Sequence, residues 1–177
     1  MAIDPDPATG LRSADLEWLE FEGRSSDARD QAGLEACRWL RRIVFVEEQA
    51  VPEALEWDGL DPEARHFLVQ APDQSGRAPA ATLPARDRIL GTARMRRLEG
   101  HAKAERVAVR ADARRRGIGR LVMQGLEARA REEGLDAVVL HAQVVAIPFY
   151  ASLGYRAHGE VFLDAGIDHR AMTKKLR

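Results

Sequence analysis

Seven consecutive residues near the middle of the chain have the types and spacing of a phosphate-binding turn. They read Arg114-Arg115-Arg116-Gly117-Ile118-Gly119-Arg120. Glycine has no Cβ, so an anion can approach the backbone closely at Gly117 and Gly119. The first N–H groups of a helix have no partner within the helix, and the helix dipole makes that end positive, so phosphate oxygens bind there. The arginines add positive charge and forked hydrogen-bond donors.

The residues on either side of this turn predict a strand before it and a helix after it. Val107 and Val109 are β-branched and alternate with other residue types, which is typical of a strand. The segment after the turn carries apolar residues at the helical spacing, which form one face: Ile118, Leu121, Val122 and Leu126. Gly134 then stands where a helix commonly ends. The turn is therefore expected at the start of a helix that follows a strand.

The turn lacks both the Gly-Lys-Ser/Thr ending of a Walker A loop and the Gly-x-Gly-x-x-Gly of dinucleotide-binding folds. Its order of strand, Arg-x-x-Gly-x-Gly and amphipathic helix resembles the acetyl-CoA-binding motif of the GNAT family of N-acetyltransferases. The resemblance implies acetyl-CoA as cosubstrate, with its pyrophosphate in the turn and no metal. It also implies that the backbone of Val107 and Val109 pairs with the pantetheine arm as an added strand would.

A second stretch, residues 42–52, reads Arg-Ile-Val-Phe-Val-Glu-Glu-Gln-Ala-Val-Pro and precedes several carboxylates and a histidine. It resembles the ElaA/YjcF-like branch of the same family, in which Val-Phe-Val-x-Glu-Gln-x-Val-Pro precedes acidic residues and Ala-x-His. Together, the carboxylates of Glu48, Glu56 and Asp58 would attract a cationic amine. The resemblance places them, with His66, on a substrate-side loop. Taken singly, each carboxylate is also typical of a solvated loop.

Acetyl transfer to an amine requires a group that removes a proton from the amine and a proton donor for the leaving thiolate. The resemblance places Tyr150 near the thioester sulfur, where a phenol is a credible acid; the alternative is a core tyrosine. Glu105 is the candidate base, because family members often carry a glutamate at the start of the central strand; the alternative is an exposed carboxylate at a strand end. His66 and His141 are rival bases, since a histidine titrates near neutral pH.

The remaining segments predict an α/β protein. Strands are expected at 16–21, 66–69, 89–95 and 136–143, a helix at 27–42, a short helix ending at Gly154, and a closing hairpin at 161–176. The resemblance implies the GNAT acyl-CoA N-acyltransferase fold, a mixed and mostly antiparallel sheet flanked by helices. Its central strands, 104–109 and 137–143, would run parallel and splay apart to admit the cofactor, with the helix from Ile118 as their crossover.

The length of 177 residues predicts one domain with a substantial core, residues 14–177, after a flexible tail at 1–13. Residues 72–84 are rich in Pro, Ala, Gly and Ser and are interpreted as an insertion between two strands. Cys37 is the single cysteine, so a disulfide framework and a cysteine-based metal cluster are excluded. The sequence has no apolar run of membrane-spanning length and no signal peptide, so we expect a cytoplasmic protein with no membrane partner.

Two other functions compete with that of an enzyme. A non-catalytic acyl-CoA-binding or regulatory protein would share the same scaffold. Nucleic-acid binding through the arginines is disfavoured by the net charge of −1. The sequence leaves the acceptor open among small amines, polyamines, amino acids and protein amines. It also leaves the oligomeric state open, although the final hairpin could pair across a homodimer.

Overall fold

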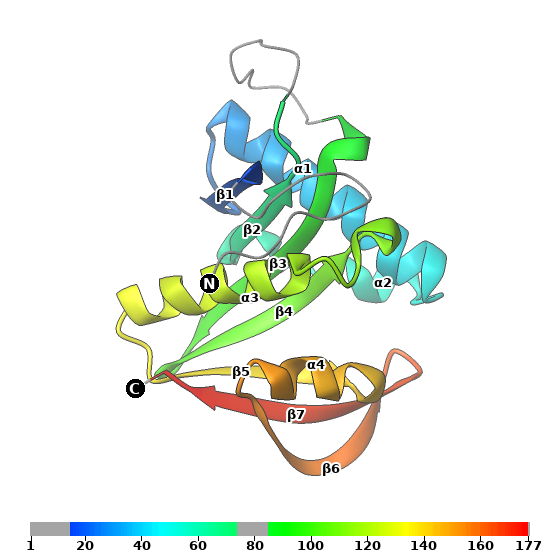
Figure 1. The fold of residues 1–177 in the computed structure, drawn as a ribbon, viewed down its shortest axis with the longest axis vertical. Helices are drawn as coiled ribbons and strands as arrows, with labels where there is room; N and C mark the ends of the chain where they lie inside the picture. Colours follow the sequence, from blue (N-terminus) through cyan, green and yellow to red (C-terminus); the bar gives the residue numbers. More distant parts are fainter. Residues whose placement is uncertain (1–14, 74–84, 177) are drawn as a thin grey trace.

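The computed structural model describes residues 15–73 and 85–176, which form one seven-stranded sheet in the order β1-β2-β3-β4-β5-β7-β6 (Figure 1). Its strands are β1 (Glu17–Glu22), β2 (Arg65–Gln70), β3 (Ile89–Leu98), β4 (His101–Val109), β5 (Ala137–Gln143), β6 (Arg156–Asp164) and β7 (Ile167–Lys175). Every neighbouring pair is antiparallel except β4 with β5. The predicted mixed, mostly antiparallel sheet with a parallel central pair is thus confirmed.

The helical elements connect these strands. They are α1 (Ala28–Arg41), the π-helical turn η2 (Arg42–Glu48), α2 (Glu53–Glu56), η3 (Asp61–Glu63), η4 (Arg86–Arg88), η5 (Ala111–Ala113), α3 (Ile118–Glu132), η6 (Val144–Ala146) and α4 (Ile147–Ser152). Helix α1 begins where Asp27 Oδ1 accepts hydrogen bonds from two backbone N–H groups of the first turn. The elements η2 and α2 were not predicted, because each is too short to show an apolar period.

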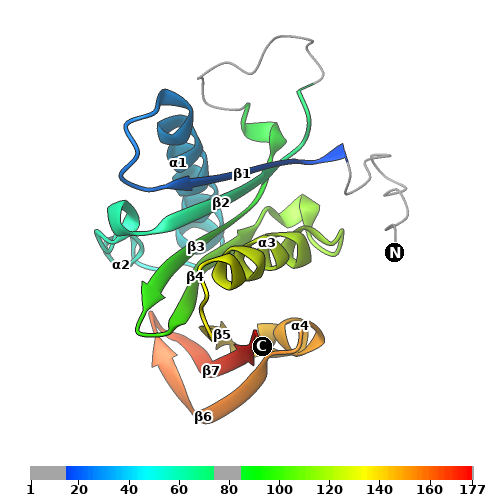
Figure 2. The same ribbon diagram turned by 90° about the vertical axis from the view of Figure 1, so that its left-hand side faces the viewer.

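Helices α1 and α3 cover opposite faces of the sheet (Figure 2). Successive side chains of a strand point to opposite faces, so each strand contributes to both layers. In β2, Phe67 and Val69 pack with the α3 layer, whereas Leu68 packs with the α1 layer. Helix α3 lies very close to the sheet, because a Cβ at Gly125 would stand only 1.9 Å from Trp18. The start of α3 also lies close to β3, because a Cβ at Gly91 would stand 2.6 Å from Ile118 Cγ2.

Strands β4 and β5 pair over only three residues. The paired positions run from His101 with Ala137 to Lys103 with Val139. Beyond Lys103 the two strands diverge (Figure 1), so the β5-facing edge of β4 has no strand partner there. The predicted splay of the parallel pair is therefore present, and the crossover between the two strands is α3, as predicted.

A bulge in β4 accompanies this divergence. Thr92 pairs with Ala108 and Arg94 pairs with Glu105, so β4 has one more residue than β3 between these pairs. Within the bulge Arg106 has a φ of 52°, a left-handed conformation that is uncommon for a residue with a side chain. A bulge bends its strand and increases the local twist, which turns β4 away from β5.

The predicted tail at 1–13 and residues 74–84 of the predicted insertion lie outside the described residues. In the part of the chain that is described, no helix is long and apolar enough to cross a membrane. Residues 15–73 and 85–176 also contain no group of three or more His, Cys, Asp or Glu side chains arranged to hold a metal ion.

Candidate active site

A cavity of about 240 Å³ opens where β4 and β5 separate. Its wall is formed by η2 and α2 on one side, by the strands β4 and β5, by Tyr150 of α4, and by the turn between β6 and β7. Segments that are far apart in the sequence therefore meet at the divergence of the two parallel strands. Charged, aromatic and apolar side chains all contribute to this wall, so the cavity offers both packing and proton-transfer groups.

Tyr150 lies at this cavity on the short helix α4. The residue is 8% exposed, and its ring packs edge-on against Phe149 and Tyr155. No hydrogen bond from a described residue contributes to the pKa of its phenol, on which burial is the sole influence. Burial raises the pKa of the Tyr150 phenol, which keeps the hydroxyl protonated. The structure thus brings Tyr150 to the cavity with a protonated hydroxyl, and its role as the acid stays a prediction.

The Gly-containing turn lies beside the same helix. Gly117 adopts a left-handed φ of 82° immediately before α3, and no side chain caps the N-terminus of that helix. A Cβ at Gly119 would stand 3.1 Å from Phe149 Cζ and 3.6 Å from Val109 Cγ2. The first turn of α3 is therefore packed between β4 and α4, close to Tyr150, and its N–H groups remain available to an anion.

The arginines of the turn differ in their surroundings. Arg115, Arg116 and Arg120 are exposed, and Arg120 Nη2 lies 3.3 Å from Ser152 Oγ of α4. Arg114 instead forms a two-pronged ion pair with Glu48, at 2.6 Å for each contact, and donates from Nε to Val109 O at 3.1 Å. Arg114 therefore joins the turn to η2 and β4, and its guanidinium is already occupied by a carboxylate and a carbonyl oxygen.

Glu105 lies at the cavity, but its carboxylate is already saturated. It accepts hydrogen bonds from Arg96 at 2.7 and 2.8 Å and from Arg94 at 3.0 Å, and Lys103 lies 3.3 Å away. Burial would raise the pKa of Glu105, but these hydrogen bonds and charges bring it down to about 2. A carboxylate with so low a pKa is a weak base. This geometry argues against the predicted role of Glu105 in removing a proton.

The other predicted carboxylates are also paired with arginines. Glu48 is held by Arg114, as described above. Glu56 is 2% exposed and lies 2.5 Å from Arg41 and 2.8 Å from Arg106. Asp58 contacts Arg106 at 3.1 Å as well as a second, buried arginine. The expectation that Glu48, Glu56 and Asp58 attract a cationic amine stays a prediction, and these ion pairs argue against it, because each carboxylate contacts an arginine within the fold.

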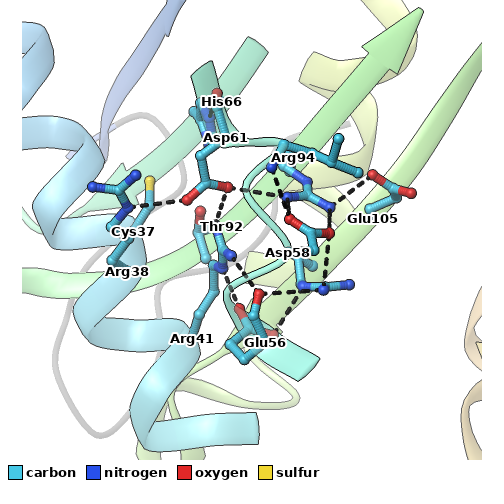
Figure 3. A network of polar contacts seen from close by, with 12 residues as sticks. Cys37, Arg38, Arg41, Glu56, Asp58, Asp61, His66, Thr92, Arg94 and Glu105 are labelled. Atoms are coloured by element: carbon cyan, nitrogen blue, oxygen red, sulfur yellow. Dashed lines mark hydrogen bonds and ion pairs between the residues drawn. The ribbon is translucent and has the colours of Figure 1, made fainter. Parts of the chain in front are cut away.

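The second partner of Asp58 is Arg94, which lies at the centre of a buried ionic network (Figure 3). The Arg94 side chain is 1% exposed and contacts Asp58 at 2.6 Å, Asp61 at 3.1 Å and Glu105 at 3.0 Å. Arg41, also 1% exposed, contacts Asp61 at 2.7 Å from the α1 side. Removing one member of such a network leaves an unpaired buried charge and typically costs about 3–5 kcal/mol. The network therefore holds α1, the loop after α2, β3 and β4 together behind the cavity.

Comparison with known proteins gives the family. Residues 62–176 match the family model for the acetyltransferase (GNAT) domain. The chain is 36% identical over 148 residues to YjcF of Bacillus subtilis (strain 168), described as an uncharacterized N-acetyltransferase, across 83% of this chain and 96% of that protein. The chain belongs to the GNAT family of acetyltransferases. The resemblance predicted from the turn and from residues 42–52 is thus confirmed.

Solved structures agree with this assignment. An acyl-CoA N-acyltransferase from Pseudomonas aeruginosa superposes on this GNAT protein with a TM-score of 0.71 at 27% identity, over 90% of this chain and 99% of that one. Escherichia coli ElaA superposes with a TM-score of 0.69 at 26% identity, over the same 90% and 99%. The seven-stranded sheet of this GNAT protein is therefore the acyl-CoA N-acyltransferase fold.

The two histidines predicted as rival bases occupy different places in this GNAT protein. His66 is fully buried and outside the cavity wall, and its Nε2 lies 3.0 Å from the carbonyl oxygen of Asp61. Burial, together with the positive charges of Arg41 and Arg94, lowers the pKa of His66 to about 4. His141 does line the cavity, next to Phe162. The predicted substrate-side role of His66 is therefore not supported, because no ligand in the cavity can reach its ring.

Sequence reasoning missed three residues that the fold brings to the cavity: Arg106, Asp164 and His169. Arg106 occupies the β4 bulge, and a bulge leaves no distinct mark in a sequence. Asp164 and His169 flank the turn between β6 and β7, in the predicted closing hairpin. The hairpin was recognised, but nothing in its sequence indicated that its turn reaches the opening between β4 and β5.

Proposed function

We propose that this GNAT protein is an N-acetyltransferase that transfers the acetyl group of acetyl-CoA to a primary amine. The observation that carries the proposal is the separation of β4 from β5 beyond Lys103, with a cavity at the opening. The uncapped N-terminus of α3 packs beside that opening, against Val109 and Phe149. One continuous path thus leads from an anion-binding turn, along an unpaired strand edge, to a cavity with a proton donor.

The cofactor would occupy this path in two parts. The pyrophosphate would accept hydrogen bonds from the first N–H groups of α3, from Ile118 to Arg120, and would contact the exposed Arg115 and Arg116. The pantetheine arm would pair with the backbone of β4 at Val107 and Val109, whose β5-facing edge is unpaired. Gly117 supplies the left-handed φ of the turn and Gly119 allows α3 to pack closely on Phe149, while Arg114 holds the turn in place through Glu48.

The chemistry follows from this placement. The amine must be neutral before it attacks the thioester carbonyl, because an alkylammonium has no lone pair and titrates only near about 10.4. A backbone N–H of the β4 bulge would face the developing oxyanion. The protonated Tyr150 hydroxyl would give its proton to the leaving sulfur.

The test is thiol release from acetyl-CoA in the presence of a panel of amines: butylamine, 1,4-diaminobutane, lysine and a peptide with a free N-terminus. Reversing the charge in Arg115→Glu plus Arg116→Glu should raise the KM for acetyl-CoA at least about tenfold, since charge-assisted contacts are each worth about 1.5–3 kcal/mol. The matched control is Arg156→Glu, on the exposed strand β6 away from the turn.

Two outcomes would contradict parts of the proposal. If calorimetry shows that acetyl-CoA binds but no amine releases thiol, the protein is an acyl-CoA-binding regulator rather than an enzyme. If the double variant and Arg156→Glu have the same KM for acetyl-CoA, the pyrophosphate is not at the turn.

A further inference from the structure

The wall of the cavity that β5 and the β6–β7 hairpin form carries three polar side chains, His141, His169 and Asp164. His169 stands directly opposite Gln143 in the β5–β7 pairing, and Gln143 lies two residues after His141. Residues two apart on a strand share a face, so the two imidazoles point to the same side of the sheet, toward the opening.

Phe162 of β6 holds the two imidazoles in one cluster. It pairs with His169 across β6 and β7, and its ring is stacked on His169 with centroids 6.2 Å apart. The same ring meets His141 edge-on at 4.9 Å. Phe162 therefore packs against both imidazoles and fixes the wall that they form.

His169 has a defined proton arrangement. Its Nδ1 lies 2.8 Å from the carbonyl oxygen of Ile167, at the start of the same strand. A carbonyl oxygen only accepts hydrogen bonds, so Nδ1 carries the hydrogen and Nε2 of the neutral ring carries the lone pair. His141 has no such orienting contact among the described residues. His169 is therefore the better placed of the two to accept a proton.

Asp164 is the one carboxylate of the cavity wall that has neither an ion pair nor a hydrogen bond among the described residues. The other two, Glu56 and Glu105, are both neutralised by arginines. Asp164 is exposed at the end of β6, beside the turn that leads into β7, the strand that carries His169. A cationic amine that enters the cavity thus meets free negative charge only on this wall.

We propose that this wall receives the acceptor, a primary alkylamine that is cationic at neutral pH: Asp164 holds its ammonium group, and His169 accepts the proton that it must lose before attack. This inference rests on the proposed acetyl transfer. It assigns the role of general base to His169, since the geometry of Glu105 argues against Glu105 in that role.

The neighbouring strands β5 and β4 carry the other titratable and charged groups around His169. From β5, His141 adds a second titratable ring. From β4, Lys103 lies 3.3 Å from Glu105, and Arg106 lies 2.8 Å from Glu56 of α2, so these charges are paired with one another. Burial, and after it the charge of Lys103, lowers the pKa of His141, which opposes its protonation next to His169. Asp164 therefore contributes the unpaired negative charge that favours a cation here.

Each proton that moves in this reaction has a donor and an acceptor among these groups. The ammonium gives one proton to Nε2 of His169, and the neutral nitrogen attacks the thioester carbonyl carbon. When the tetrahedral intermediate collapses, the C–S bond breaks and the sulfur takes a proton from the Tyr150 hydroxyl. The nitrogen still carries one surplus proton, which restores the phenol as the amide forms. The products are an amide, a thiol and one proton on imidazole, which is lost to water.

The test compares His169→Gln with His158→Gln, an exposed histidine of β6 that does not line the cavity. The rate of acetyl transfer to 1,4-diaminobutane should fall about a hundredfold or more at neutral pH in His169→Gln, as removal of a general base predicts. The acidic limb of its kcat/KM profile should disappear, while calorimetry should show unchanged acetyl-CoA affinity. His158→Gln should keep the wild-type rate and profile.

The ammonium subsite has its own test. Asp164→Asn should raise the KM for 1,4-diaminobutane about fivefold at low salt, and the difference should shrink as salt screens the charge. Asp168→Asn, on the same hairpin but outside the cavity wall, is the matched control. The KM for acetyl-CoA should be unchanged in both variants.

Different results would refute the base assignment, the ammonium subsite and the proposed function. A wild-type rate and acidic limb in His169→Gln would overturn the base assignment, as would loss of the limb in His141→Gln alone. Equal amine KM values for Asp164→Asn and Asp168→Asn would remove the ammonium subsite. A wild-type protein that releases no thiol with any amine would instead refute the proposed function itself, and with it this inference.

Discussion

The buried His66 should make the protein lose stability between neutral and mildly acidic pH. Its ring is fully buried, Nε2 lies 3.0 Å from Asp61 O, and Nδ1 has no partner. Burial, together with the charges of Arg41 and Arg94, lowers the pKa of His66 to about 4. In the unfolded chain a histidine titrates near about 6.5. Between these two pKa values, the imidazole of His66 is therefore protonated in the unfolded state but neutral in the folded state.

The sign and size of the effect follow from linkage. Above about pH 6.5 neither state binds the proton, so His66 makes no pH-dependent contribution. As the pH falls toward about 4, only the unfolded state gains the proton, and the free energy of unfolding decreases. Between about pH 7 and about pH 5 the loss is about 2 kcal/mol. In a protein of this size that lowers the melting temperature by roughly 4–8 °C.

Urea unfolding of the wild type and of His66→Gln at these two pH values measures this loss. The quantity to compare is the change in unfolding free energy between the two pH values, which should be smaller in His66→Gln by about 2 kcal/mol. His158→Gln should behave as the wild type. The carboxylates of Glu105 and Asp58 interfere little, because they titrate below this window. An equal pH dependence in wild type and His66→Gln would refute the view that His66 is held neutral.

Three further predictions concern single side chains. Tyr150→Phe should lower turnover at least about tenfold, with little change in acetyl-CoA affinity or melting temperature, because only the hydroxyl is lost; wild-type turnover would make Tyr150 a packing residue. Cys37 should not react with an aromatic disulfide reagent until the protein unfolds, since burial raises its pKa to about 12. Gly125→Ala should destabilise the protein by about 1–3 kcal/mol, because its Cβ would stand 1.9 Å from Trp18, whereas Gln124→Ala on the exposed face should not.

The sequence predicted the elements with a clear period and the motif between them. The alternation around Val107 and the apolar face from Ile118 located β4 and α3, and the glycines located the turn between them. It could not predict which charges pair, because pairing is set by the tertiary fold. Glu48 and Arg114 are 66 residues apart in the sequence, and nothing near either of them indicates the other. A carboxylate that is free and one that is neutralised look the same in a sequence.

This difficulty explains why the acidic stretch after α1 was assigned to the acceptor. In the structure this acidic stretch instead contacts Arg106, which lies in the bulge of β4. Arg106 adopts a left-handed φ of 52°, which costs about 1–3 kcal/mol for a residue with a side chain. Its guanidinium is held by Leu55 O at 3.0 Å, Asp58 Oδ2 at 3.1 Å and Glu56 Oε2 at 2.8 Å. These contacts offset the backbone cost and keep β4 bent away from β5.

The carboxylates of Glu56 and Asp58 therefore help to keep β4 and β5 apart. Glu56 also contacts Arg41 of α1, and Asp58 also contacts Arg94 of β3, so the bulge is connected to both neighbouring elements. If these contacts were lost, β4 could straighten and extend its pairing with β5 beyond Lys103, which would close the proposed site for the thioester. The negative charge of this stretch is thus used to shape the site, and attraction of the amine is left to the free carboxylate of Asp164 on the opposite wall.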